Sequence, residues 1–324
     1  MTSIAMIDAA AQRLAGHVRR TPLLHSPFLD AIASRRVWVK AECLQHTGSF
    51  KFRGGWSAVS ALAEPARERG VIAYSSGNHA QGVALAAQRH GAPAVIIMPE
   101  DAPAIKVANT RAYGAEVVFY DRLTGIREDI GTALAQERGL TLIKPYDEPE
   151  VIAGQGTTGL EIAEQAAALG IDHADVLVCC GGGGLTSGVA LALEARAPGL
   201  RARPAEPAGF DDTARSLVAG AHQTNAAAGG SICDAIVTPT PGEITFPILK
   251  RLAGPGLVVS DDDCLRAIGL AFAHLKIVIE PGGVVALAAA LFRPEQIAGD
   301  DVIVVATGGN IDPALFAKAI GTLS

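Results

Sequence analysis

Apolar runs of strand length alternate with segments of helical periodicity along most of the chain. The strand-like runs are residues 37–42, 71–73, 94–98, 116–120, 141–143, 175–180 and 302–305. Apolar residues recur at helical spacing in 104–113, 124–138, 162–169, 190–195, 263–274 and 313–320. This alternation predicts an α/β fold with mostly parallel, doubly wound sheets.

One region departs from the alternation. Residues 207–241 are rich in Ala, Gly, Thr and Pro and show little periodicity. We expect an ordered loop with short helices there.

Composition fits this fold and narrows the function. Of the 324 residues, 49% are hydrophobic and 19% are charged, which suits parallel strands buried on both faces. The net charge of −6 and the lack of a basic run make nucleic acid and anionic membranes poor partners. The N-terminus lacks a signal pattern, and we expect no membrane-spanning segment. The five cysteines are Cys43, Cys179, Cys180, Cys233 and Cys264. Their spacing contains no CxxC motif, and we therefore expect a reducing cytoplasm.

Lys51 stands where a strand passes into a helix. The strand-like run 37–42 precedes it, and Trp56, Val59 and Leu62 follow at helical spacing. A cation at this place opposes the positive end of the helix dipole. Joining the amine to a carbonyl as a Schiff base would remove the charge. A solvated lysine that opens a helix is the alternative, and this motif alone does not decide between them.

Four other segments share one pattern, in which glycines or hydroxyl residues lie between an extended segment and a helix. They are residues 74–82, 181–184, 280–283 and 307–310. Open α/β sheets bind their ligands at such places, beyond the carboxyl ends of the strands.

Together with Lys51, these segments resemble the motifs of the tryptophan-synthase-β-like (fold-type II) enzymes that use pyridoxal phosphate. Within that family the chain is most similar to the serine/threonine dehydratase and serine racemase branch, from Thr21 to Asn310. The resemblance implies two doubly wound α/β domains with the cofactor in the cleft between them. Residues 50–146 would form the small domain, and residues 1–49 with 147–324 the large one. It also implies a homodimer.

The glycine run is suited to an anion. Gly181, Gly182, Gly183 and Gly184 precede a helix expected near Leu185, so their backbone N–H groups can surround a phosphate. A tight turn that lets strand and helix pack closely is the alternative. The resemblance makes this phosphate the one on the cofactor.

A second glycine pattern points elsewhere. Residues 154–159 match the dinucleotide fingerprint Gly-x-Gly-x-x-Gly, which would indicate a nicotinamide-dependent oxidoreductase. The fingerprint requires a buried strand directly upstream, whereas residues 145–150 are rich in turn formers. We therefore reject that function and expect a backbone turn beside the cleft.

The resemblance assigns roles to several side chains. Lys51 would hold the cofactor aldehyde and then act as the base on the substrate α-proton. Asn78 would bind the ring oxygen, and Thr307 would lie beside the ring nitrogen, although a helix N-cap is compatible with the same threonine. Ser75, Ser76 and His79 would receive the substrate carboxylate; a structural role for His79 stays open.

Three further positions bear on specificity. Ser76 would place a second proton-exchanging group opposite Lys51, which allows racemase activity. Arg127 aligns with an arginine directed toward the cleft in racemase-like members, so a second carboxylate on the substrate becomes plausible; a surface arginine is the alternative. Either Thr238 or Thr240 could supply a hydroxyl to the substrate, and the alignment cannot choose between them.

A divalent-cation site is implied by Glu206 and Asp212. With the carbonyl of Phe210 as third protein ligand, they resemble the family's magnesium or calcium site, and such hard cations take oxygen ligands. Two solvated carboxylates are the alternative.

These observations lead to a functional hypothesis. We expect a pyridoxal-phosphate-dependent dehydratase, a lyase that converts L-serine or L-threonine to a 2-oxo acid and ammonia. A 3-hydroxyaspartate dehydratase and a serine racemase are alternatives within the branch. From other classes, we weigh a nicotinamide-dependent oxidoreductase and a catalytically silent small-molecule binding protein.

Overall fold

Two sheets organise residues 2–75, 77–102, 104–121, 126–227 and 229–323, which the computed structural model of the chain describes. The six-stranded sheet consists, in spatial order, of β1 (Leu23–His25), β2 (Arg36–Lys40), β10 (Asp301–Val305), β7 (Ala174–Cys179), β8 (Leu200–Pro207) and β9 (Leu257–Val259). The four-stranded sheet consists of β5 (Glu116–Tyr120), β4 (Ala94–Pro99), β3 (Val71–Tyr74) and β6 (Thr141–Leu142). Neighbouring strands are parallel except β1 and β2. The expected α/β class with mostly parallel sheets is confirmed.

Helices connect and cover these strands. They are α1 (Ile4–Leu14), α2 (Pro27–Ala33), α3 (Lys51–Ala61), α4 (Glu64–Arg69), α5 (Asn78–Arg89), α6 (Ala104–Ala112), α7 (Arg127–Arg138), α8 (Pro149–Ala168), α9 (Gly184–Arg196), α10 (Asp212–Ala219), α11 (Thr245–Leu252), α12 (Asp261–Leu275), α13 (Pro281–Phe292) and α14 (Pro313–Ile320). The 3₁₀ segments are η1 (Glu42–Leu44), η2 (His46–Gly48), η3 (Asp234–Ile236), η4 (Pro294–Gln296) and η5 (Gly321–Leu323).

The six-stranded sheet is buried on both faces. In β10, Val302 and Val304 pack in the layer that contains α13, whereas Ile303 and Val305 pack in the layer that contains α9. Successive side chains of a strand point to opposite faces, so an unbroken apolar run fills both layers. This is why residues 302–305 read as a continuous apolar run in the sequence.

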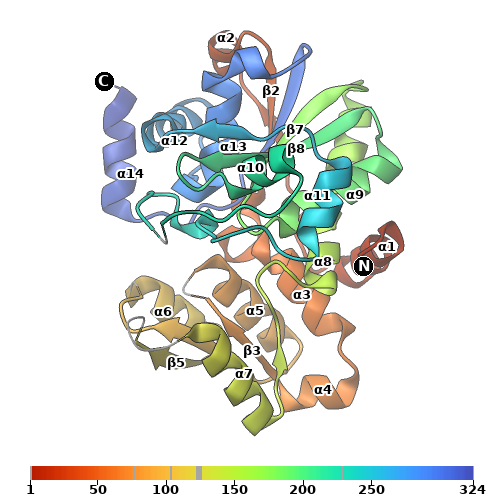
Figure 1. Cartoon of the computed structure of the whole chain (residues 1–324), viewed down its shortest axis with the longest axis vertical. Coiled ribbons are helices and arrows are strands. Elements are labelled where there is room, and N and C mark those ends of the chain that lie inside the picture. The colour runs from red at the N-terminus through yellow and green to blue at the C-terminus, as the bar shows by residue number, and fades with distance from the viewer. Residues whose placement is uncertain (1, 76, 103, 122–125, 228, 324) are drawn as a thin grey trace.

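The four-stranded sheet lies in the lower half of Figure 1 together with α4, α5, α6 and α7. Ala73 packs toward α5, and Ile72 and Tyr74 pack on the opposite side with residues of α7. Helices α3 and α8 lie between this half and the six-stranded half (Figure 1). They pack on each other, and α3 also packs on α5.

Most expected elements occur near their expected bounds, and region 207–241 carries α10 and η3 between loops. The backbone turn expected at residues 154–159 is wrong, because these residues lie inside the buried helix α8. A Cβ on Gly154 would come within 2.5 Å of the carbonyl O of Arg53 in α3. A Cβ on Gly159 would come within 2.9 Å of the Cα of Val189 in α9. These glycines thus allow α8 to approach its neighbours, and the oxidoreductase alternative loses its motif.

Two expectations on environment can be compared with the structure. Within the described residues, no helix is long and apolar enough to cross a membrane. All five cysteines are buried and none forms a disulfide. The cytoplasmic compartment stays a prediction.

Candidate active site

A cavity of about 170 Å³ lies at the carboxyl ends of strands from both sheets. Ser75 follows β3, residues 180–184 follow β7, and Thr307 follows β10, and all of them line the cavity. The cavity therefore brings together Lys51 and three of the four other segments singled out in the sequence, at the edge where α/β sheets bind ligands. Glu280, from the remaining segment, lines it as well.

Lys51 places its amine in this cavity from the start of α3. The Nζ atom donates a hydrogen bond to the carbonyl O of Pro145 at 2.7 Å and lies 5.2 Å from the centroid of the Phe50 ring. Burial lowers the pKa of the Lys51 amine to about 8, and the opposing influence of Glu280 is smaller. An amine that can lose its proton near neutral pH can attack a carbonyl and can later accept a proton.

The glycine run serves close packing and lines the cavity as well. A Cβ on Gly182 would come within 2.2 Å of the Tyr146 ring, and Gly183 has a φ of +89° at the N-cap of α9. Packing, the alternative considered above, thus accounts for part of this motif. The backbone of the run also faces the cavity at the N-terminus of α9, where amide dipoles favour an anion.

The polar groups around the cavity fit pyridoxal phosphate. The hydroxyl of Thr186, in the first turn of α9, is buried, lines the cavity and has no hydrogen-bond partner among the described residues. Together with the N–H groups of the glycine run and of Leu185, it suits a phosphate. Lys51 suits the aldehyde. The buried hydroxyl residue Thr307 suits the ring nitrogen, and its carbonyl O is held by the N–H of Phe50 at 3.1 Å.

Asn78 joins the residue before α13 to the loop after β10 through side-chain hydrogen bonds. Its Nδ2 donates to Glu280 Oε1, and its Oδ1 accepts from Asn310 Nδ2 at 2.7 Å. Burial raises the pKa of the Glu280 carboxyl to about 7, although the hydrogen bond from Asn78 opposes the rise. Burial therefore favours the neutral form of Glu280 below about pH 7.

His79 is held as a neutral ring. Its Nε2 is 3.0 Å from the carbonyl O of Ile143, and its Nδ1 has no partner within the described part of the chain. Burial, aided by the charge of Lys51, lowers the pKa of His79 to about 3. A pKa this low makes His79 unsuitable as a general base. The single N–H of the neutral ring faces the Ile143 carbonyl, so Nδ1 can only accept a hydrogen bond. Ser75 Oγ accepts the N–H of Gly77 at 3.1 Å, which fixes the loop before α5.

Two cationic side chains besides Lys51 reach the cavity. Arg127 lies with its guanidinium carbon 5.5 Å from the centroid of the Tyr74 ring. Lys106 of α6 lies 3.3 Å from the carboxylate of Asp234 in η3, and both residues line the cavity. Sequence reasoning singled out Arg127 but missed Lys106 and Asp234.

The structure separates the two threonines that the sequence left open. Thr238 lines the cavity, and its buried hydroxyl has no hydrogen-bond partner among the described residues. Thr240 is not among the described lining residues. Ser76 lies outside the described residues.

Glu206 and Asp212 form a buried carboxylate pair away from the cavity. Glu206 accepts the N–H groups of Thr213 and Ala214 at 2.9 and 2.7 Å. Asp212 Oδ1 accepts from Asn225 at 2.6 Å, and Asp212 Oδ2 has no partner in the described residues. Burial raises the pKa of Asp212 to about 6 and, with the charge of Asp212, raises that of Glu206 well above its usual range.

A cation would relieve this repulsion, and the free oxygen of Asp212 fits one. Within the described residues, however, no group of three or more His, Cys, Asp and Glu side chains could hold a metal. Phe210 is buried in the loop between Glu206 and Asp212, and its carbonyl would have to complete the protein ligands.

Several lining residues were assigned no role from the sequence. They include Lys106, Tyr146, Gln155, Asp234 and Glu280. Gln155 lies in the rejected fingerprint, and both polar atoms of its buried amide lack a partner among the described residues. Glu280 belongs to the segment 280–283 that the sequence singled out, as the residue before a helix.

Comparison with known proteins gives these residues a context. The family model described as pyridoxal-phosphate dependent enzyme matches residues 14–308. An L-threo-3-hydroxyaspartate ammonia-lyase of Pseudomonas sp is 44% identical, over 99% of each chain. A serine racemase of Schizosaccharomyces pombe is 38% identical, over 96% of this chain and 95% of its own. The crystal structure of a T.th. threonine deaminase has 44% identity and a TM-score of 0.90, and the match covers 96% of this chain and 99% of that one.

Proposed function

The chain belongs to the pyridoxal-phosphate dependent enzyme family, in its serine/threonine dehydratase–serine racemase branch, and we propose that its substrate is 3-hydroxyaspartate. A hydroxy-amino-acid ammonia-lyase of this branch removes water from its substrate and releases a 2-oxo acid and ammonia. The substrate was only an alternative at the sequence level, behind L-serine and L-threonine. Two relatives named L-threo-3-hydroxyaspartate ammonia-lyase, 44% and 40% identical, support it above the serine/threonine assignment.

A guanidinium in the lining of the cavity supports the proposal. Arg127 lines the same cavity as Lys51, whereas Lys106, the other cation there, pairs with Asp234. A guanidinium binds a carboxylate with two parallel hydrogen bonds, which an ammonium cannot do. Arg127 therefore binds the second carboxylate of the substrate, while the loop around Ser75 receives the first.

The bound cofactor withdraws electrons from the substrate and makes its α-proton acidic. Lys51 would hold the cofactor, and its amine would accept the α-proton, a role that suits a pKa of about 8. Asn78, which is oriented by Glu280 and Asn310, would hold the ring oxygen. Thr238 is the hydroxyl that faces the substrate. The β-hydroxyl would then leave as water with the proton that Lys51 accepted, and hydrolysis of the product would give the 2-oxo acid and ammonia.

L-serine and L-threonine are the second candidate substrates. The solved relative named threonine deaminase, at 44% identity, favours them. Neither carries a second carboxylate, so neither offers Arg127 an anion to bind. Racemisation rests on Ser76 and on relatives named serine racemase.

The proposal extends to the rest of the molecule. Glu206, Asp212 and the carbonyl of Phe210 bind Mg²⁺ or Ca²⁺, which the unpaired Asp212 oxygen supports. Residues 50–146 form the small domain, since all four strands of the smaller sheet fall within 71–142. The enzyme works as a homodimer in the cytoplasm, as the resemblance and the free cysteines suggest.

The substrate assignment is tested by replacing Arg127 with methionine. A charge-assisted pair contributes roughly 1.5–3 kcal/mol, so kcat/KM for L-threo-3-hydroxyaspartate should fall roughly ten- to a hundredfold. The kcat/KM for L-serine should change little, because serine has no group for Arg127 to bind. Arg111→Met is the matched control, since Arg111 also lies 5.5 Å from an aromatic centroid, that of Phe119, but does not line the cavity.

Equal losses on both substrates in Arg127→Met would show that Arg127 only supports the fold. A wild-type protein that is inactive on 3-hydroxyaspartate and active on L-serine would return the assignment to serine and threonine.

A further inference from the structure

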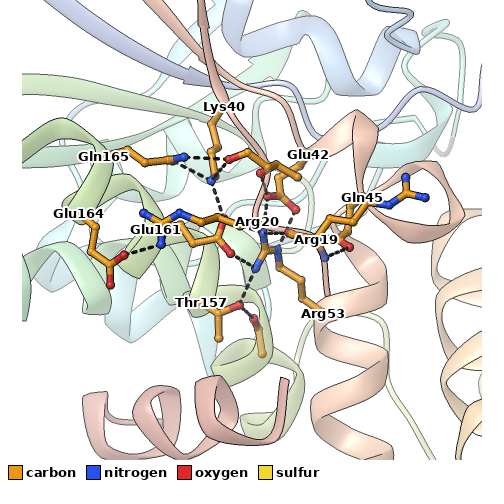
Figure 2. Close-up of polar contacts among 12 residues, drawn as sticks. Arg19, Arg20, Lys40, Glu42, Gln45, Arg53, Thr157, Glu161, Glu164 and Gln165 are labelled. Carbon is orange, nitrogen blue, oxygen red and sulfur yellow. Dashed lines mark hydrogen bonds and ion pairs between the residues drawn. The ribbon is translucent and has the colours of Figure 1, made fainter. Parts of the chain in front are cut away.

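Four charged side chains meet in the interior next to the start of α3. Lys40, Glu42 and Arg53 have no exposed side-chain surface, and Glu161 has 14%. Figure 2 shows their contacts. Two cations face two carboxylates, so the charges of this cluster balance. Burial alone would raise the pKa of Glu42, but the charge and hydrogen bonds of Arg53 hold it below its usual range.

Arg53 is the centre of this charge cluster. Its Nε and Nη2 donate to the two oxygens of Glu42 at 2.9 and 2.8 Å. Its Nη1 and Nη2 donate to the two oxygens of Glu161 at 2.8 and 3.0 Å. Further bonds reach Thr157 Oγ1 and the carbonyl O of Arg19, both at 3.2 Å. A planar guanidinium can satisfy two carboxylates in this way, and an ammonium cannot.

Both carboxylate partners of Arg53 lie outside the four-stranded half of the molecule. Glu42 lies in η1 directly after β2, and Glu161 lies in α8. Lys40, the last residue of β2, donates to Glu161 at 2.6 Å and to Gln165 at 2.8 Å, which ties the strand to the helix (Figure 2). Glu161, which binds Arg53 from α8, is therefore also tied to β2 through Lys40.

Lys51 is two residues from Arg53, in the same first turn of α3. Phe50, at the N-cap of this helix, makes no side-chain capping bond. On its other side, α3 meets α5 by backbone contact, since a Cβ on Gly82 would come within 2.9 Å of the carbonyl carbon of Lys51. The charge cluster thus supplies the side-chain anchor of this turn.

We propose that Arg53 is a positioning residue, which fixes the first turn of α3 to the six-stranded half and keeps Lys51 at a constant place relative to the glycine run 181–184. The inference rests on the proposed role of Lys51 as the cofactor-binding lysine. Buried ion pairs give little net stability compared with apolar residues of the same volume. The paired hydrogen bonds of the Arg53 guanidinium to Glu42 and Glu161 instead fix the direction and distance of the backbone that carries Lys51.

The test uses the holoenzyme of Arg53→Lys, which keeps the positive charge and loses the paired guanidinium hydrogen bonds to the two carboxylates. A displacement near 1 Å at a reacting group can cost about a hundredfold in rate, so kcat should fall roughly ten- to a hundredfold, while KM changes less than about threefold. The pH midpoint of the visible absorption of the bound cofactor should shift, because the Lys51 nitrogen changes its surroundings. The rate at which added pyridoxal phosphate develops this absorption in the cofactor-free protein should fall as well.

Arg203→Lys is the matched control. Arg203 is buried in β8, binds Asp175 at 2.7 Å and lies outside the lining of the cavity. We expect Arg203→Lys to lower the melting temperature about as much as Arg53→Lys does. The kcat, the pH midpoint of the absorption and the cofactor-binding rate of Arg203→Lys should not change. Losses of kcat that follow melting temperature alike in both variants would overturn the proposal, as would an unchanged absorption midpoint and kcat in Arg53→Lys.

Glu161→Gln tests the inference if Arg53→Lys does not fold, because it removes one charge and keeps the volume. The same three readouts should change in the same direction, and their constancy would refute the positioning role. A wild-type protein in which borohydride fixes the cofactor to another lysine would instead refute the proposed function. The two failures are therefore distinguishable.

Discussion

Glu280 is a single buried carboxyl whose protonation couples the site to pH. Its pKa in the folded protein is about 7, compared with an ordinary value of 4.5, chiefly because of burial. Folding therefore takes up a proton between these two values. The contribution of Glu280 to the free energy of unfolding is therefore fully present below pH 4.5 and is lost as the pH rises through 7. The loss amounts to about 3 kcal/mol, at 1.36 kcal/mol per pKa unit.

We predict that Glu280→Gln flattens this dependence in the cofactor-free protein. Glutamine keeps an oxygen for Asn78 and never becomes an anion, so the variant should match wild type near pH 4.5 and be more stable near pH 8. Urea unfolding at several pH values measures this difference. Glu243→Gln, at a side chain that is 87% exposed, should follow wild type. Parallel curves for Glu280→Gln and wild type would contradict the prediction.

At the scale of elements, the close approach of α8 to α3 depends on Gly154. A Cβ there would come within 2.5 Å of the carbonyl O of Arg53 and 2.6 Å of the Cβ of Ser57. We predict that Gly154→Ala lowers the free energy of unfolding by about 1–3 kcal/mol, the range for overpacked cores. Gly321→Ala is the control, since a Cβ there meets nothing within 4 Å and its φ of −59° is helical. Denaturant unfolding compares the two, and equal stabilities would contradict the packing role.

The same glycine shows where prediction from the sequence ends. The spacing of residues 154–159 suits a phosphate loop and a helix that packs closely, and only the neighbouring backbone distinguishes them. The strand at residues 302–305 was predictable because all four of its residues are apolar, as expected for a strand buried on both faces. The charge cluster was not, since Lys40 and Glu161 lie 121 positions apart in the chain.

At the scale of the whole molecule, the order of the motifs predicted the site, and the fold adds what no local pattern encodes. Recognisable strand-like runs precede Lys51, residues 181–184 and Thr307 in the sequence. Because the carboxyl ends of parallel strands meet at one edge of the sheet, these residues were expected to converge. Lys106 and Asp234 come from α6 and η3, and they meet only because the two halves face each other across the cavity. No periodicity in either segment indicates that contact.

The stability of the whole molecule provides the test of the cation site. A ligand that binds only the folded protein stabilises it by about 2.7 kcal/mol at a hundredfold excess over its Kd. We predict that Mg²⁺ or Ca²⁺ raises the melting temperature of wild type and that a chelator reverses this. Asp212→Asn should abolish the increase, because it removes the charge of the carboxylate whose second oxygen is unpaired among the described residues. Asp211→Asn, which removes the same charge one residue earlier at a side chain paired with Arg215, should keep the increase. If added cation and chelator leave all three proteins unchanged, Glu206 and Asp212 bind no metal.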